Sequence, residues 1–242
     1  MKMKDTKAII FDKDGTLLDF DAFWVPVSEK AILDVLAYFG EGESLLSEIL
    51  EAFGVHNGVT DIDGVLCKGT YEEMGEIVYN VLYKNGHTVA PSEVIKRVIS
   101  SYNEAAEEGV VKPTSSKLSE VLRELKNQGK KLALITTDNE EITRKCLQKL
   151  GIEELFDKIY TDDGKTPTKP HPYYALDFCK AYNLDKKRVL MVGDTETDVL
   201  FAKNAGINMI ALARSEKNRQ KLCLLTDTVV ADLSELLTIL KR

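Results

Sequence analysis

The stretch "AIIFDKDGTLLDF", residues 8–20, gives the clearest indication of the fold of this chain. It opens with four apolar residues, and Asp12 and Asp14 follow them. A short run that is apolar at every position is typical of a parallel strand buried on both faces of a sheet. Gly15 comes next and permits a tight turn. The stretch therefore predicts a buried strand that ends in two carboxylates.

Strands and helices alternate along the second half of the chain, which extends this prediction to a whole domain. Strand-like runs are KKLALIT (130–136), FDKIYT (156–161), RVLMVGD (188–194) and INMIAL (207–212), and stretches with helical periodicity separate them. A short strand and an amphipathic helix end the chain. This alternation predicts an α/β fold, in which a doubly wound parallel sheet carries helices on both faces.

The segment between the first strand and this alternating part shows helical periodicity only. Apolar residues recur at helical spacing in four segments, 32–39, 45–53, 74–82 and 94–102. Four such helices can close on one another as a small bundle. We therefore predict an α/β core domain, residues 1–19 and 113–242, and a helical domain, residues 20–112, inserted after the first strand.

The composition disfavours several classes of partner and location. The net charge is -7, and no Lys/Arg-rich patch is visible, which argues against nucleic acid and against an anionic membrane surface as partners. No apolar run approaches the roughly 18 residues of a membrane-spanning helix, and the N-terminus is too polar for a signal peptide. The four cysteines are far apart in the sequence, so we expect reduced thiols and a cytoplasmic protein.

A second Asp-x-Asp-Gly sequence, "TDIDGV" at residues 60–65, repeats the spelling of the first. It follows "HNGVT", residues 56–60, inside the helical segment, where we expect no strand. Asp and Gly are common turn residues. We therefore interpret the second copy as a turn and the first as the reaction centre.

Further polar groups follow the other predicted strands. Thr136 and Thr137 end one apolar run, and Asp194 ends another, with Asp198 four residues later. Lys169 lies in the loop "TKPHPYY", residues 168–174. Ligands of open parallel sheets bind at the carboxyl ends of the strands, so these groups are candidates for one site. For Asp198 two interpretations stay open, a metal ligand and a helix cap.

Together and in this order, these residues resemble the haloacid dehalogenase superfamily of phosphatases, over nearly the whole chain. "FDKDGTLLD" (11–19) is similar to its first motif, Thr136 to its second, Lys169 to its third and "GDTETD" (193–198) to its fourth. The stretches "KLGI", "KPHP" and "AKNAGI" are similar to the phosphoglycolate-phosphatase-like branch, and the helical insertion resembles the helical cap domain of that branch.

The resemblance implies a role for each site residue. Asp12 would be the nucleophile that forms an aspartyl-phosphate, and Asp14 the acid that protonates the leaving oxygen and then the base that activates water. Thr136, Thr137 and Lys169 would bind the phosphate. Mg²⁺ would be held by Asp12, Asp194 and the main-chain carbonyl of Asp14. Thr16 would fix the turn, although it is also an ordinary turn residue.

Three function classes remain open at this point. The first is a Mg²⁺-dependent phosphatase for a small phosphorylated metabolite, such as phosphoglycolate, a sugar phosphate or a nucleotide. The second is a phosphosugar mutase of the β-phosphoglucomutase type, which shares both aspartates. The third is a non-catalytic binding protein on the same scaffold, which the intact set of site residues disfavours. The sequence does not indicate whether the protein is a monomer or a dimer.

Overall fold

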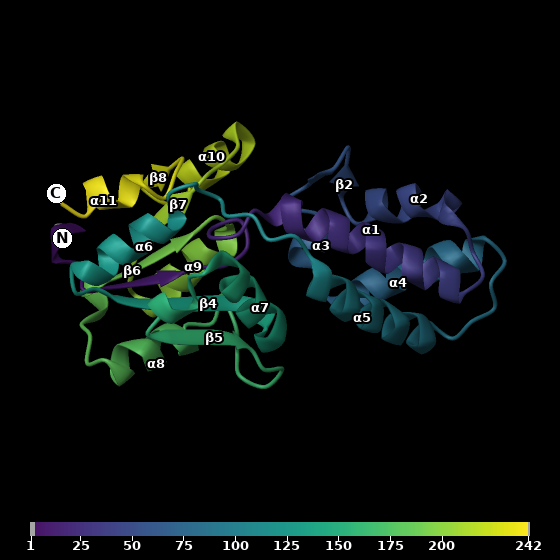
Figure 1. Cartoon of the computed structure of the whole chain (residues 1–242), viewed down its shortest axis with the longest axis horizontal. Helices are drawn as coiled ribbons and strands as arrows, with labels where there is room; N and C mark the ends of the chain where they lie inside the picture. The colour runs from purple at the N-terminus through teal and green to yellow at the C-terminus, as the bar shows by residue number, and fades with distance from the viewer. Residues whose placement is uncertain (1–2, 242) are drawn as a thin grey trace. The chain divides into compact units, whose positions relative to one another are not determined.

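Strand β1 (Ala8–Phe11) lies inside a six-stranded sheet whose strand order is β5-β4-β1-β6-β7-β8, in a computed structural model that describes residues 3–241 (Figure 1). The other strands are β4 (Lys131–Asn139), β5 (Lys158–Asp162), β6 (Val189–Gly193), β7 (Asn208–Leu212) and β8 (Val229–Val230). Every neighbouring pair is parallel. The predicted doubly wound parallel sheet is confirmed.

Helices cover both faces of this sheet, and Figure 1 shows α6 and α8 on opposite sides of it. The helices are α6 (Leu118–Asn127), α7 (Glu140–Leu150), α8 (Tyr173–Ala181), α9 (Glu196–Ala205), α10 (Glu216–Cys223) and α11 (Glu235–Ile239). Short 3-10 turns lie at Met3–Asp5, Glu153–Leu155 and Lys186–Arg188. Within β1, Ile9 and Phe11 pack with α6 and α11, whereas Ala8 and Ile10 pack with α8 and α9. Burial on both faces explains why β1 is apolar at every position.

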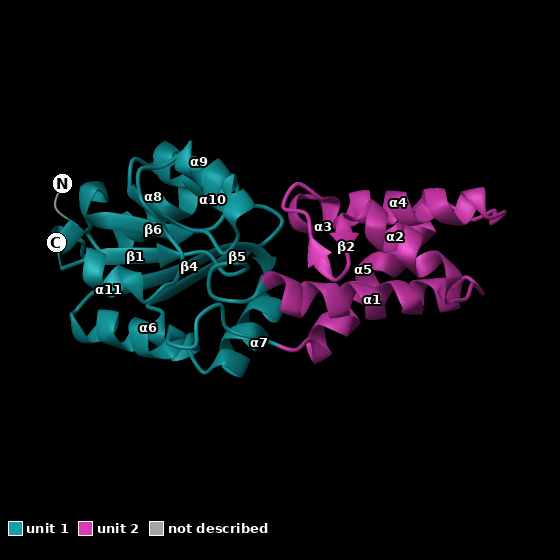
Figure 2. Ribbon diagram, turned by 90° about the horizontal axis from the view of Figure 1, so that it is seen from above, with its two compact units in different colours: residues 1–19, 111–242 teal, residues 20–110 magenta. Residues whose placement is uncertain are grey.

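Residues up to 19 and from 111 onward form one unit, and residues 20–110 form a second, helical unit (Figure 2). The helices of the second unit are α1 (Phe20–Tyr38), α2 (Leu46–Ala52), α3 (Val65–Lys68), α4 (Tyr71–Lys84) and α5 (Pro91–Glu108), with a 3-10 turn at Glu43–Leu45. Helix α5 packs against both α1 and α4. Thr70 and Glu73 form a capping box that begins α4, so the sequence specifies where this helix starts.

The helical unit also contains a small antiparallel hairpin, so the expectation of helices only was wrong. Its strands are β2 (Val55–His56) and β3 (Val59–Thr60), and Asn57 and Gly58 between them both have positive φ angles, 51° and 75°. Asn-Gly is the residue pair that favours such a two-residue hairpin turn. The sequence signal was therefore present in "HNGV".

The hairpin places a short strand directly before the second Asp-x-Asp-Gly sequence. A strand does precede Asp61, contrary to expectation, but it has two residues, and Val59 is 58% exposed. Residues 61–64 form a turn, as predicted, in which the main-chain N–H of Asp63 donates to the Asp61 carboxylate at 3.1 Å. The carboxylate of Asp63 also pairs with Lys68 at 2.7 Å. This copy follows an exposed hairpin instead of a buried parallel strand.

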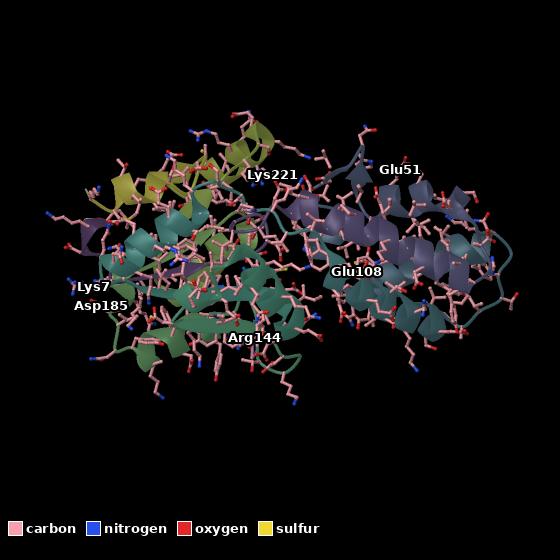
Figure 3. All side chains as sticks on the ribbon, viewed as in Figure 1. Lys7, Glu51, Glu108, Arg144, Asp185 and Lys221 are labelled. Carbon is pink, nitrogen blue, oxygen red and sulfur yellow. The ribbon has the colours of Figure 1, made fainter. Side chains whose placement is uncertain are left out.

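Charged residues that make structural contacts lie at the amino end of the parallel sheet. Figure 3 labels Lys7 and Asp185 at this end, where the Lys7 main-chain N–H donates to the Arg188 carbonyl at 2.8 Å. Asp157, which precedes β5, accepts hydrogen bonds from Lys126 at 2.6 Å and Lys131 at 2.8 Å. These charges lie at the edge opposite to the carboxyl ends of the strands. None of the helices in residues 3–241 is long and apolar enough to cross a membrane.

Because Phe11 is fully buried within the sheet core, truncating it should leave a cavity. We expect Phe11→Ala to lower the free energy of unfolding by about 3 to 5 kcal/mol. The matched control is Leu224→Ala at an 86% exposed position, which should change stability by less than about 0.5 kcal/mol. Urea unfolding should be followed by circular dichroism, because the single tryptophan, Trp24, belongs to the helical unit. Equal losses for the two variants would contradict the placement of β1.

Candidate active site

The strand register brings the carboxyl ends of β1, β4 and β6 to one edge of the sheet. Phe11 pairs with Leu134 on one side and with Val192 on the other. Asp12 stands one residue beyond Phe11, and its main-chain N–H donates to the Val192 carbonyl at 2.9 Å. Thr136 lies two residues beyond Leu134, and Asp194 lies two residues beyond Val192. The three predicted strand-end residues therefore share one edge.

Lys169 joins two carboxylates at this edge. Its Nζ donates to Asp12 Oδ1 at 2.5 Å and to Asp198 Oδ1 at 2.7 Å. All three side chains are at most 8% exposed. The loop before α8 thus places its lysine where the sequence predicted a phosphate contact, next to the candidate nucleophile.

Asp198 serves as a helix cap and also belongs to the carboxylate cluster. Its Oδ2 accepts hydrogen bonds from the main-chain N–H groups of Asp194 (3.2 Å) and Thr195 (3.1 Å), and from Thr195 Oγ1 (2.7 Å). The contact with the Thr195 N–H, together with the Asp198 N–H that donates to Thr195 Oγ1 at 3.3 Å, forms the capping box of α9. The other oxygen of Asp198 faces Lys169, so capping leaves one carboxylate oxygen available to the site.

Two glycines let the backbone approach the clustered carboxylates. A Cβ atom at Gly15, whose φ is +78°, would lie 2.1 Å from Asp194 Oδ2. A Cβ atom at Gly193 would lie 2.4 Å from Asp198 Cγ. Any side chain at either position would displace a carboxylate. Gly15 is therefore required both by its left-handed backbone and by the space that Asp194 fills.

Asp194 is oriented by two further residues. Thr16 Oγ1 donates to Asp194 Oδ1 at 3.0 Å, and Asn218 Nδ2 donates to the Asp194 main-chain oxygen at 2.9 Å. Thr16 was a candidate from the sequence. Asn218 was missed, because α10 carries little apolar periodicity and Leu222 is its buried residue.

The cluster holds three carboxylates and one ammonium group, and burial makes this imbalance costly. The pKa of Asp12 is raised to about 7, chiefly by burial and also by the charges of Asp198 and Asp14, against the opposing effect of Lys169. Burial, followed by the charges of Asp12 and Asp198, raises the pKa of Asp194 well above its usual range. For Lys169, burial lowers the pKa, but Asp12 and Asp198 more than compensate and keep the ammonium charged.

The donor set fits a hard divalent cation. One carboxylate oxygen each from Asp12, Asp194 and Asp198 lies within 4.8 Å of the others. Carboxylate oxygens are ligands that Mg²⁺ prefers, and Mg²⁺ keeps several waters, so a few protein ligands suffice. The cluster includes Asp198 in addition to the two expected carboxylates. Coordination by the main-chain carbonyl of Asp14 stays a prediction.

Asp14 lies outside this cluster, and its carboxylate pairs with the ammonium group of a lysine. Lys13 Nζ lies 2.8 Å from Asp14 Oδ2 and 2.9 Å from Asp138 Oδ2. Neither Lys13 nor Asp138 was a candidate from the sequence. The sequence signal that could have revealed it is the position of Lys13, directly after a buried strand and between two aspartates. A lysine side chain at such a position cannot easily reach solvent.

The two threonines after the apolar part of β4 differ in burial. Thr136 is 2% exposed, and its Oγ1 accepts a hydrogen bond from the Asp138 main-chain N–H at 3.2 Å. Thr137 is exposed. Their predicted contacts to phosphate stay predictions.

Comparisons with known proteins agree with this arrangement. The family model described as haloacid dehalogenase-like hydrolase matches residues 6–206. The chain is 24% identical to pyrophosphatase PpaX of Bacillus mycoides, over 97% of this chain and 96% of the relative. It is 26% identical to phosphoglycolate phosphatase of Psychrobacter arcticus, over 86% and 84% of the two chains.

The fold also matches a solved structure closely. The crystal structure of a predicted phosphoglycolate phosphatase from Haemophilus somnus 129pt has a TM-score of 0.72 to this chain and 20% sequence identity, and the match covers 97% of this chain and 98% of that one. The family model spans most of the α/β unit together with the whole helical unit. The chain therefore belongs to the haloacid dehalogenase-like hydrolases.

Proposed function

We propose that this phosphatase hydrolyses the phosphate monoester of a small metabolite, with Asp12 as nucleophile and a divalent cation as cofactor. The observation that carries the proposal is the position of Asp12. Its carboxylate emerges from the buried strand β1, lies 2.5 Å from the Lys169 ammonium, and belongs to a three-carboxylate cluster. A second acid, Asp14, follows two residues later with a separate set of contacts.

Asp12, Asp194 and Asp198 would hold the cation, which we propose to be Mg²⁺. When bound, the cation offsets the repulsion between these carboxylates and the dianionic phosphate, about 4 kcal/mol for each pair of like charges at roughly 4 Å and an effective dielectric near 20. Lys169 adds a positive charge next to the nucleophile. Thr136 and Thr137 are proposed to bind the phosphate oxygens from the end of β4.

The reaction would proceed in two steps on the chain's own residues. First, an oxygen of Asp12 attacks phosphorus, the bond to the leaving oxygen breaks, and Asp14 gives that oxygen its proton. Next, water attacks phosphorus, Asp14 takes a proton from the water, and the Asp12 carboxylate and inorganic phosphate separate. Asp14 returns to its starting protonation state at the end of each cycle, so the protons balance.

The helical unit is proposed to act as a cap that excludes water and contacts the leaving group, as the family resemblance implies. The free thiols of Cys146, Cys179 and Cys223 support a reducing compartment, and we propose the cytoplasm. The names of the relatives support phosphoglycolate and pyrophosphate as first substrates to test.

The substrate class is tested by phosphate release from a panel that also includes sugar phosphates and nucleotides, with Mg²⁺ and with a chelator. We expect Mg²⁺-dependent release from at least one metabolite. Turnover of a glucose bisphosphate without net release of phosphate would instead identify a mutase. Absence of any turnover and of phosphoryl transfer would leave the chain as a binding protein and contradict the proposal.

Substitution of the two acids of the first motif should separate their roles. Asp12→Asn removes the attacking carboxylate and should abolish turnover. Asp14→Asn removes the proton donor and acceptor and should lower kcat by about 10²- to 10⁴-fold. The control is Asp157→Asn at the amino end of the sheet, where the carboxylate pairs with Lys126 and Lys131 and accepts a hydrogen bond from the Leu132 main-chain N–H, and kcat should stay within about two-fold of the unmodified protein. Full activity of Asp12→Asn would overturn the assignment of the nucleophile.

The raised pKa of Asp12 predicts that stability and metal binding depend on pH. In the cation-free protein, folded Asp12 keeps its proton up to about pH 7, whereas the unfolded chain releases it near pH 4, so stability should fall as pH rises between these values. Mg²⁺ should therefore raise Tm near pH 8 and have little effect near pH 5. A cation at about 100 times its Kd contributes about 2.7 kcal/mol.

Thermal unfolding with Mg²⁺ or EDTA at both pH values measures this effect. Asp194→Asn should abolish the Mg²⁺-dependent rise in Tm, whereas Asp157→Asn should lower Tm and keep the rise. A rise of equal size at both pH values, or one that persists in Asp194→Asn, would contradict the assignment of the cation site.

A further inference from the structure

Lys13 is fully buried beside the candidate acid-base residue. Its side chain is 1% exposed, and a lysine is almost never fully buried unless it is paired. Its Nζ lies 3.1 Å from Asp14 Oδ1, 2.8 Å from Asp14 Oδ2 and 2.9 Å from Asp138 Oδ2. The contact with Asp14 Oδ1 is a hydrogen bond, and the other two are ion-pair contacts.

Asp138 is itself fixed at the junction between β4 and α7. Its Oδ1 accepts a hydrogen bond from the Asn139 main-chain N–H at 2.8 Å, and its own N–H donates to Thr136 Oγ1 at 3.2 Å. Asn139 is the N-cap of α7 and accepts from the Ile142 N–H at 2.9 Å. Lys13 thereby ties the Asp14 side chain to a junction that the backbone holds in place.

Lys13 provides one ammonium group for the two carboxylates of Asp14 and Asp138, whereas the cluster around Asp12 has one ammonium group for three carboxylates. Burial lowers the pKa of Lys13, but Asp14 and Asp138 raise it above its usual range, so the ammonium stays charged. An ion pair with so little exposure is costly to break from one side, because the remaining charge is left unpaired. Its geometry should therefore be well defined.

We propose that Lys13, held by Asp138, is a positioning residue that fixes the carboxyl group of Asp14 for proton exchange with the substrate oxygens. The inference rests on the proposed function, in which Asp14 exchanges those protons. A proton donor must come within about 2.6 to 3.2 Å of its acceptor, and a misplacement of about 1 Å can cost on the order of 100-fold in rate. Lys13 and Asp138 are placed to set that distance through Asp14.

Two classes of substrate distinguish this role from a general effect on folding. The p-nitrophenolate released from p-nitrophenyl phosphate is stable without a proton. The alkoxide released from an alkyl phosphate needs one as the bond breaks. A residue that acts through the proton donor should therefore matter more for an alkyl phosphate than for p-nitrophenyl phosphate.

The experiment compares kcat/KM for p-nitrophenyl phosphate with kcat/KM for the alkyl phosphate that the unmodified protein turns over fastest, because kcat/KM covers phosphoryl transfer to Asp12 and excludes the later hydrolysis that both substrates share. Lys13→Met should lose on the order of 10- to 100-fold more kcat/KM on the alkyl phosphate. Lys13→Arg keeps the charge and should restore part of the loss. Asp138→Asn should show the same selectivity to a smaller extent, because it weakens the anchor and leaves the Lys13–Asp14 pair.

The matched control is Lys130→Met, which removes another buried lysine of the same unit. Lys130 donates to the Thr6 carbonyl at 2.9 Å, ahead of β4, at the amino end of the sheet. This variant should lower Tm and leave the ratio of the two kcat/KM values unchanged. A change of ratio in Lys130→Met as large as that in Lys13→Met would overturn the inference.

A double substitution tests whether Lys13 acts through Asp14. In an Asp14→Asn background, Lys13→Met should cause no further loss on the alkyl phosphate, whereas additive losses would overturn the inference. Equal losses on both substrates in Lys13→Met would also overturn it. Should that variant fail to fold, equal losses in both Asp138→Asn and Lys13→Arg have the same consequence.

The same measurements separate this inference from the proposed function. If Asp14→Asn shows the selective loss and the Lys13 and Asp138 variants do not, the inference alone is overturned. If Asp14→Asn itself loses equally on both substrates, the proposed role of Asp14 is wrong, and the positioning role of Lys13 is overturned with it.

Discussion

Three buried carboxylates lie with one lysine ammonium group at the carboxyl edge of the sheet. The rest of the α/β unit must hold this excess of negative charge in place. Asp12, Asp194 and Asp198 lie close enough for each pair to repel by about 4 kcal/mol at roughly 4 Å and an effective dielectric near 20. Lys169 offsets part of this repulsion, and the N-terminus of α9 offsets another part by donating to Asp198. An apolar sheet core on both faces of β1 supplies the stability that holds such a cluster together.

The two aspartates of the first motif differ in environment, although a single residue separates them. Asp12 is buried beside Lys169 and two other carboxylates; its burial and the neighbouring carboxylates raise its pKa against the effect of Lys169, and the three carboxylates favour a bound cation. Asp14 faces Lys13 and, through it, Asp138. Two acids with different surroundings can carry different roles in one reaction, and here the surroundings agree with a nucleophile and a proton carrier. The same spelling at residues 61–64 lacks these partners, because Asp63 pairs with the largely exposed Lys68.

The fold was predictable where burial leaves a pattern in the sequence, and less so where contacts join distant residues. Four apolar positions in β1 and the later alternation were enough to predict the parallel sheet and to bring Asp12 and Asp194 to one edge. The β2–β3 hairpin was missed although Asn57-Gly58 marks it, because four helical stripes dominated that segment. Helix α10 was missed because it presents little apolar surface to the core. The partnership of Lys13 with Asp138 could not be found, since nothing near either residue signals the other.

If Asp12 is the nucleophile, it carries the phosphoryl group during turnover, and this group can be trapped. The protein is mixed with substrate and Mg²⁺, quenched with acid within one turnover, and treated with borohydride, which reduces an acyl phosphate of aspartate to the alcohol of homoserine. Peptide mass spectrometry then locates the reduced residue. We expect homoserine at position 12. Homoserine at another aspartate, or active protein that never yields a reduced residue, would contradict it.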